Sequence, residues 1–155
     1  MGSIVRDVDI DAPAAQVWSL LEDVRRLPDF SPSTISVENA PARLDAVGQS
    51  YAQVGSIFGK RYRSTWTVEE LVDGRRIRSA GTVGPGVGYC LTQDLEPTGP
   101  ATCHLRVTID YRLPLGALGR LAARVGVERR AAAEAGEVLT GIKRVAERSH
   151  APGPA

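Results

Sequence analysis

The order of hydrophobic periodicities along the chain is the feature that most constrains its fold. Ile4–Ile10 alternate between apolar and polar side chains, as a strand does, and Ala12–Val24 carry apolar side chains at helical spacing. Ile35–Leu113 form a run of strand-like segments, and Leu118–Glu147 return to one long helical pattern. We therefore predict an α+β fold with one strand, two short helices, a curved antiparallel sheet and a long C-terminal helix.

Turn signals containing Gly, Pro and Asp divide the central run at hairpin spacing. The predicted strands are Ile35–Glu38, Ser50–Ile57, Lys60–Leu71, Arg75–Thr82, Val87–Glu96 and Thr102–Leu113. Together with the first strand they give a sheet of about seven strands, most of it an antiparallel meander. Asp11 is the expected N-cap of the first helix, and Pro28 and Pro32 keep the second helix short.

Length and charge limit the possible classes of protein. A chain of 155 residues has room for one domain, predicted over residues 1–148, and the Pro- and Gly-containing residues 149–155 are predicted to be a disordered tail. With 19 basic and 18 acidic side chains, the net charge of +1 does not favour nucleic acid as a partner. No apolar run approaches the roughly 20 residues that span a bilayer, and no signal peptide precedes the first strand, so we predict a cytoplasmic protein without stable membrane insertion.

Several local motifs resemble a known family. They are Val8–Pro13 (VDIDAP), Val17–Leu21 (VWSLL), Leu27–Pro32 (LPDFSP), Val47–Gly48, Trp66–Glu70 and Ile142–Glu147. In this order they resemble the START-like, helix-grip superfamily, in its polyketide cyclase/dehydrase and lipid-transport branch. The resemblance implies a sheet wrapped around the terminal helix, with an apolar ligand cavity between them. Members include aromatic polyketide cyclases, lipid and hormone binders and quinone carriers, so the resemblance leaves the chemistry open.

Alternation along each strand predicts which side chains face this cavity. The predicted ligand-binding residues are Tyr51, Gln53, Tyr62, Ser64, Trp66, Ser79, Tyr89, Leu91, Gln93, Val107, Ile109 and Tyr111, with Leu121 and Val125 from the long helix. Tyrosine hydroxyls and glutamine amides can bind carbonyl groups, and aromatic faces stack on flat rings, so this lining suits a phenolic or polyketide ligand. The alternative is that Tyr62, Trp66 and Tyr111 fill a closed core.

The candidate catalytic residues are Arg6, Tyr51, Tyr62 and Tyr89. Arg6 shares the apolar face of the first strand, where a guanidinium could stabilise an enolate, or it could be an edge residue whose head reaches water. His104 falls on the opposite face to the apolar set of its strand, so we expect it in solvent. Alternating Arg and Glu residues between Arg120 and Glu137 are expected to form the solvated face of the long helix.

The spacing of Cys90, Cys103, His104 and His150 is not that of a metal site, and we expect neither a metal nor a cofactor. Two functions stay open from the sequence. The first is an enzyme that cyclises or dehydrates a hydrophobic, aromatic or polyketide-derived molecule. The second is a non-catalytic carrier or sequestering protein for a lipid, quinone or natural product. Either would be a monomer or a homodimer.

Overall fold

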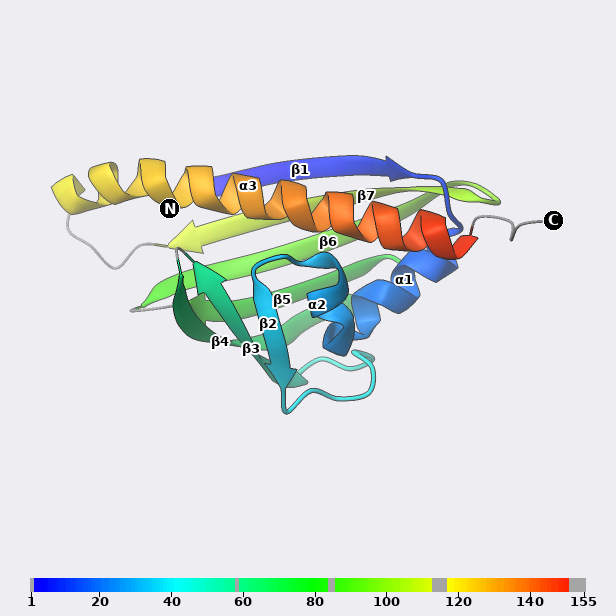
Figure 1. The fold of residues 1–155 in the computed structure, drawn as a ribbon, viewed down its shortest axis with the longest axis horizontal. Coiled ribbons are helices and arrows are strands. Elements are labelled where there is room, and N and C mark those ends of the chain that lie inside the picture. The colour runs from blue at the N-terminus through cyan, green and yellow to red at the C-terminus, as the bar shows by residue number, and fades with distance from the viewer. Residues whose placement is uncertain (1, 58, 84–85, 113–116, 151–155) are drawn as a thin grey trace.

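The computed structural model describes residues 2–57, 59–83, 86–112 and 117–150. The strands and helices follow one another in the order that the sequence predicts (Figure 1). Their order and bounds are β1 (Gly2–Ile10), α1 (Ala14–Glu22), the 3-10 turn η1 (Val24–Arg26), α2 (Leu27–Phe30), β2 (Thr34–Glu38), β3 (Ser50–Ile57), β4 (Lys60–Val72), β5 (Arg76–Val83), β6 (Val87–Gly99), β7 (Thr102–Arg112) and α3 (Ala117–His150).

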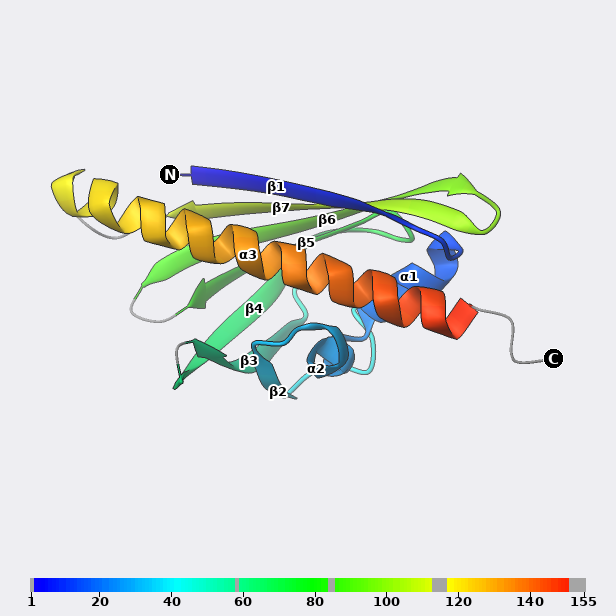
Figure 2. The ribbon, with the colours of Figure 1, turned by 45° about the horizontal axis from the view of Figure 1, so that its top comes forward.

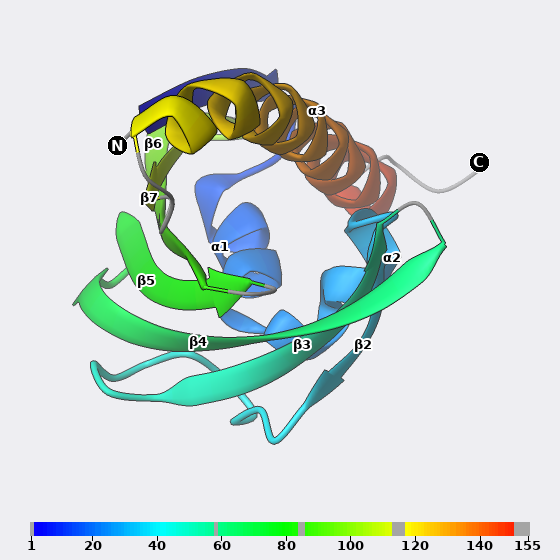
Figure 3. The same cartoon turned by 90° about the vertical axis from the view of Figure 1, so that its left-hand side faces the viewer.

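The seven strands form one antiparallel sheet in the order β1-β7-β6-β5-β4-β3-β2. β1 and β2 are consecutive in the chain but lie at opposite edges of the sheet. The segment between them, α1, η1 and α2, must therefore cross the concave side, and the end-on view shows it inside the curl of the strands (Figure 3). This crossing places α1 and α2 on the concave side of the sheet, where α3 also lies. The arrangement confirms the predicted helix-grip architecture.

The concave side of the sheet carries the main core. α3 lies along this side beside β1, and α1 and α2 pack near its C-terminal half (Figure 2). The fully or nearly fully buried core side chains include Ile10, Val17, Ile77, Leu105 and Ile142. A smaller cluster of Ile4, Tyr111 and Ala131 lies toward the other end of α3. Two apolar clusters are thus separated along the length of the helix.

A bulge in β4 helps the sheet to curve. The pairing with β5 runs from Val68 opposite Ser79 to Glu70 opposite Arg78, so Glu69 is an extra residue on β4. Bulges of this kind bend the strand and increase its local twist. The hairpin that follows turns at Gly74, whose φ of +74° is the left-handed conformation that glycine adopts without strain.

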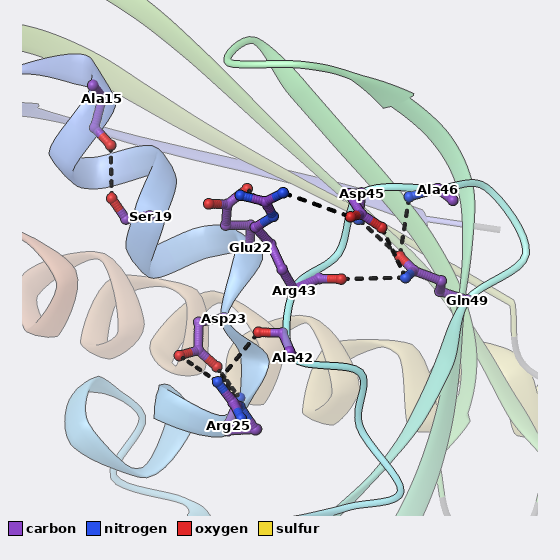
Figure 4. Close-up of polar contacts among 10 residues, drawn as sticks. All are labelled: Ala15, Ser19, Glu22, Asp23, Arg25, Ala42, Arg43, Asp45, Ala46 and Gln49. Atoms are coloured by element: carbon purple, nitrogen blue, oxygen red, sulfur yellow. Dashed lines mark hydrogen bonds and ion pairs between the residues drawn. The ribbon is translucent and has the colours of Figure 1, made fainter.

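The long connection between β2 and β3 is held by polar contacts within itself and with η1 (Figure 4). Gln49 accepts the backbone N–H groups of Asp45 and Ala46 at 2.8 and 3.0 Å, and its amide donates to the carbonyl of Arg43 at 3.2 Å. Arg25, itself paired with Asp23, donates to the carbonyl of Ala42. These bonds satisfy backbone groups that a connection without regular structure leaves unpaired.

Helix ends are where the structure differs from the sequence predictions. Asp11 does not cap α1, because Pro13 occupies the N-cap position and the Asp11 N–H donates to Glu147 at 2.9 Å. Pro28 does not stop the second helix but lies in the first turn of α2, where no amide hydrogen is needed. α3 begins at Ala117, one residue before the Leu118 at which the sequence pattern places the start of the long helix. α3 also includes Ser149 and His150, assigned above to a tail whose remaining residues are not described.

Within the part of the chain that the structure describes, no helix has the length and apolar character needed to cross a membrane.

Candidate functional site

Aromatic side chains form one row across the inner face of the sheet. Tyr51 on β3 pairs with Trp66 on β4, and Trp66 pairs with Gly81 on β5. Gly81 pairs with Tyr89 on β6, which in turn lies opposite Tyr111 on β7. Because strand residues at alternate positions share a face, these pairings bring four aromatic rings from four strands to the concave side.

A cavity of about 170 Å³ lies between this face and α3. Apolar atoms make up most of its surface, as is typical of sites for small molecules. The sheet contributes Tyr51, Gln53, Tyr62, Ser64, Trp66, Val83, Tyr89, Leu91, Gln93, Val107 and Ile109, and the helices contribute Leu27, Arg130, Ala131, Glu134, Ala135 and Val138. The cavity thus lies where the helix-grip resemblance implies one.

Most of the predicted lining residues meet at this cavity. Those that line it are Tyr51, Gln53, Tyr62, Ser64, Trp66, Tyr89, Leu91, Gln93, Val107 and Ile109. Ser79 instead lines a separate void of about 30 Å³, behind Tyr51 and against α1 and α2. Tyr111 is buried in the smaller apolar cluster rather than at the cavity surface. Leu121 and Val125 belong to the part of α3 whose side chains lie outside the described residues.

Arg6 does not reach the cavity, although its position on the strand is as predicted. It pairs with Val107, an inward residue of β7, so its Cα belongs to the inner face. The side chain is nevertheless exposed, and Nη1 donates to the carbonyl of Val5 at 2.9 Å. β1 is an edge strand, and a long guanidinium side chain there can turn past the edge into water. In the structure Arg6 therefore lies at the edge of the sheet with its head exposed, and it is not among the residues that line the cavity.

α3 contributes two charged cavity residues that the sequence analysis assigned to the solvated face of the helix. Arg130 Nη2 donates to Glu134 Oε2 at 3.1 Å, and both side chains line the cavity. The second carboxylate oxygen of Glu134 accepts a hydrogen bond from the buried Ser33 hydroxyl. Glu134 lies three residues after Ala131 and four before Val138, both cavity residues, so helical spacing was the signal that could have identified it.

Tyr62 joins this network from the sheet. It shares a side-chain hydrogen bond with Ser33, which links it to Glu134. Burial raises the pKa of Tyr62, and the nearby Glu134 carboxylate raises it further, outweighing the hydrogen bond to Ser33 and the charge of Arg130. Tyr62 is therefore a neutral phenol near pH 7, which can donate a proton or a hydrogen bond.

The other two cavity tyrosines are also held in the neutral form. Burial raises the pKa of Tyr51 far above its ordinary value. Burial is also the main reason that the pKa of Tyr89 is raised, with smaller contributions from Tyr62 and Tyr111. All three tyrosine hydroxyls at the cavity are thus protonated over the whole physiological range and can donate hydrogen bonds.

Two further side chains that line the cavity, Gln53 and Trp66, are held by hydrogen bonds to neighbouring residues. Gln53 Nε2 donates to Thr34 Oγ1 at 2.6 Å, and the Thr34 hydroxyl donates to Ser31 Oγ at 2.8 Å. The Trp66 indole N–H donates to Ser64 Oγ at 2.9 Å. Such bonds hold the side chains in one orientation before any ligand binds, which is how preorganised sites reduce the entropic cost of binding.

A larger hollow of about 530 Å³ lies elsewhere, among outer-face side chains of β5, β6 and β7 that include His104. It is lined mostly by charged groups, and Arg76 already pairs with Asp94 at 2.6 Å and with Glu70 at 3.4 Å. A surface of mutually paired charges does not suit an apolar ligand, so the smaller internal cavity is the better candidate site. No cluster of three or more metal-ligating side chains occurs among residues 2–57, 59–83, 86–112 and 117–150.

Comparison with known proteins agrees with this geometry. A family model described as polyketide cyclase / dehydrase and lipid transport matches residues 1–147. The comparison with curated proteins gave no match. Among solved structures, the di-domain aromatase/cyclase BexL from the BE-7585A biosynthetic pathway is 25% identical with a TM-score of 0.77, and the likeness covers 98% of this chain and 48% of that one.

Two other solved structures match over almost their whole length. The Zhui aromatase/cyclase from Streptomyces sp. R1128 is 20% identical, with a TM-score of 0.84 and 99% of each chain covered. A START superfamily protein from Mycobacterium smegmatis is 15% identical, with a TM-score of 0.70, and the likeness covers 95% of this chain and 98% of that one. At these identities the two likenesses establish the fold.

Proposed function

This chain belongs to the polyketide cyclase / dehydrase and lipid transport family, and on that premise we propose that it binds an aromatic or polyketide-derived molecule in the internal cavity and catalyses its cyclisation or dehydration. One observation carries the proposal. The cavity combines an aromatic, mostly apolar lining with two groups that can exchange protons, Tyr62 and Glu134, which are joined through the Ser33 hydroxyl. An apolar carrier site needs the first feature but not the second.

The lining supports binding of a flat, oxygen-bearing molecule. Tyr51, Trp66 and Tyr89 present aromatic surface, which stacks against planar rings. Gln53 and Gln93 supply amide groups that pair with carbonyl or hydroxyl oxygens of a ligand. These groups would fix the orientation of a ligand whose affinity comes from apolar burial.

The ionisable groups support an aldol-type reaction. In such a cyclisation a carbon next to a carbonyl loses a proton, a carbon–carbon bond forms to a second carbonyl, and the resulting alkoxide takes up a proton. Loss of that hydroxyl with a neighbouring C–H proton then releases water. Glu134 is the proposed proton acceptor, Tyr62 the proposed proton donor, and Arg130 the cation that stabilises the intermediate enolate.

The solved structures of similar fold support the same class of reaction. Both BexL and Zhui carry the description aromatase/cyclase, and the likeness to Zhui extends over 99% of both chains. Holding a flexible chain in one folded conformation supplies a large part of the barrier reduction for ring closure, so a well-shaped cavity needs few catalytic groups.

A carrier function is the second candidate, and one observation favours it. Both carboxylate oxygens of Glu134 are already engaged, one by Ser33 and the other by Arg130. This arrangement is also what a purely structural bridge between α3 and the segment before β2 would show.

Incubation with a linear tetraketide thioester, followed by mass spectrometry, separates the two functions. An enzyme forms a cyclic product lighter by one water, and Glu134→Gln lowers the rate by about 100-fold because the proton acceptor is lost. Glu137→Gln is the matched control, since Glu137 is exposed on the same helix. Recovery of the thioester unchanged by a protein that binds it would support the carrier function, and equal rates for the two variants would refute the role of Glu134.

A further inference from the structure

We propose that the cavity accepts a single aromatic ring, and that Trp66, lying flat over Gly81, sets this size limit. The inference rests on the proposed function, because it names the class of molecule that the same cavity takes. It concerns the shape of the site and not the reaction. Two features carry it, the volume of the cavity and the packing of its aromatic floor.

The cavity volume fits one ring. A cavity of about 150 Å³ lined by apolar side chains holds benzene, whereas sites for drug-sized molecules have volumes of about 300 to 1,000 Å³. At about 170 Å³, this cavity is close to the first value and well below the second. Protein interiors are close-packed at a density of about 0.74, so the side chains that line the cavity leave little room beyond its volume. A molecule with fused rings would have to displace some of them.

Trp66 lies flat because its neighbour on β5 has no side chain. A Cβ added at Gly81 would meet Trp66 Cδ2 at 2.6 Å and Cε3 at 2.7 Å, so the indole occupies the space directly above the glycine. The hydrogen bond from Trp66 Nε1 to Ser64 Oγ, 2.9 Å long, holds the ring in this orientation. The indole therefore forms part of the cavity floor, with one face on the sheet.

A second aromatic side chain of the floor, Tyr62, also packs over a glycine. Gly55 on β3 pairs with Tyr62 on β4, and a Cβ there would lie 2.5 Å from the Tyr62 hydroxyl oxygen. Opposite this floor, α3 presents the small side chains of Ala131 and Ala135, with Arg130, Glu134 and Val138 beside them. The space between the aromatic rings and the two alanines matches a planar ring in thickness, and the larger side chains around it limit the width of a ligand.

Calorimetric titration with phenol, 2-naphthol and 2-anthrol tests the limit, because these probes carry one hydroxyl on one, two and three fused rings. Apolar area alone would make the larger probes bind more tightly. We expect the opposite order in the wild-type protein, with 2-anthrol at least about tenfold weaker than phenol, because overpacking a rigid site is unfavourable.

Two variants assign the limit to the floor. Trp66→Leu should enlarge the cavity and raise the affinity for 2-naphthol and 2-anthrol relative to phenol by about tenfold or more. Gly81→Ala adds a Cβ that would meet the indole and would also lie 2.8 Å from the carbonyl oxygen of Thr65, so it should push the indole into the cavity and weaken all three probes. Gly99→Ala is the matched control: a Cβ there would lie 2.7 Å from Thr102 Oγ1, and neither residue lines the cavity. Thermal melting establishes that each variant is folded, and Trp66→Phe replaces Trp66→Leu if the latter is not.

The possible results distinguish a failure of the size limit from a failure of the proposed function. Binding of 2-anthrol as tight as that of phenol, or an unchanged order in the Trp66 variant, would overturn the size limit and leave the proposed function intact. Failure of all three probes to bind wild-type protein would refute the proposed function as well.

Discussion

His104 joins two strands on the outer face of the sheet. Its Nδ1 lies 2.7 Å from Asp9 Oδ1 and its Nε2 lies 3.0 Å from Asp7 Oδ2, both on β1, while Glu96 of β6 pairs with it in the ladder. The hydrogen bond to Asp9 is the main reason that the pKa of His104 is raised, with added contributions from the charges of Asp9 and Asp7. The alternation of side chains along the strand correctly predicted that His104 lies on the face opposite the cavity.

This raised pKa predicts a pH-dependent stability. A group with a higher pKa in the folded state contributes stability that is fully present below its unfolded pKa of about 6.5 and is lost as the pH rises through the folded pKa. Because the pair lies near the surface, the loss should be below about 1 kcal/mol. Urea unfolding of wild type and His104→Gln between about pH 5 and pH 9 measures it. Equal pH dependence in both proteins would contradict the assignment.

The sequence identified residues on strands better than residues on the helix. Alternation placed Tyr51, Trp66 and Gln93 on the cavity side because a strand has only two faces and buried apolar neighbours mark the inner one. A helix has no such binary choice, and charge alone assigned Glu134 to solvent. Its carboxylate lies at the cavity because Ser33, 101 positions away in the chain, satisfies it there, and no local pattern carries that information.

At the scale of elements, α3 approaches the backbone of α2 closely at Gly141. A Cβ at Gly141 would overlap the carbonyl oxygen of Phe30 and lie 2.9 Å from its carbonyl carbon. Since both atoms are backbone, neither can move as a side chain would. Gly136 on the same helix has no atom within 4 Å of that position. The two glycines therefore have different roles although they lie in one helix.

Alanine substitutions at these glycines should change stability in opposite directions. Gly141→Ala should lower the free energy of unfolding by about 1 to 3 kcal/mol, because the two helices must separate. Gly136→Ala should raise it by up to about 1 kcal/mol through the better helix propensity of alanine. Chemical denaturation of both variants checks this, and a stable Gly141→Ala protein would show that the α2–α3 contact is looser than described.

Element types were predictable because each has a clear period, whereas helix ends depend on partners distant in the chain. Asp11 is a good N-cap by residue type, yet its backbone N–H donates to Glu147, 136 residues away. Lys143 adds a bond to the carbonyl of Asp9 at 2.9 Å. These contacts fix the β1–α1 junction against the end of α3, so tertiary structure and not local capping sets where α1 begins.

At the scale of the whole molecule, the chain order explains why a cavity exists. β1 and β2 lie at opposite edges, so the intervening helices must cross the concave side, where α3 also lies. α1 and α2 fill one end of this space with the main core, and the cluster of Ile4, Tyr111 and Ala131 lies toward the other end. The aromatic cavity lies between them, and Arg130 and Glu134 line it from α3.

The two tryptophans allow the most direct test of ligand binding in this cavity. Trp66 lines it, and Trp18 is buried in the main core away from it. Each indole N–H gives its own cross-peak in a ¹⁵N–¹H correlation spectrum, and Trp18→Phe assigns the pair. Titration with phenol should shift the Trp66 peak in a saturable way and leave the Trp18 peak in place. An unmoved Trp66 peak at saturating phenol, or equal shifts of both peaks, would contradict binding in the cavity.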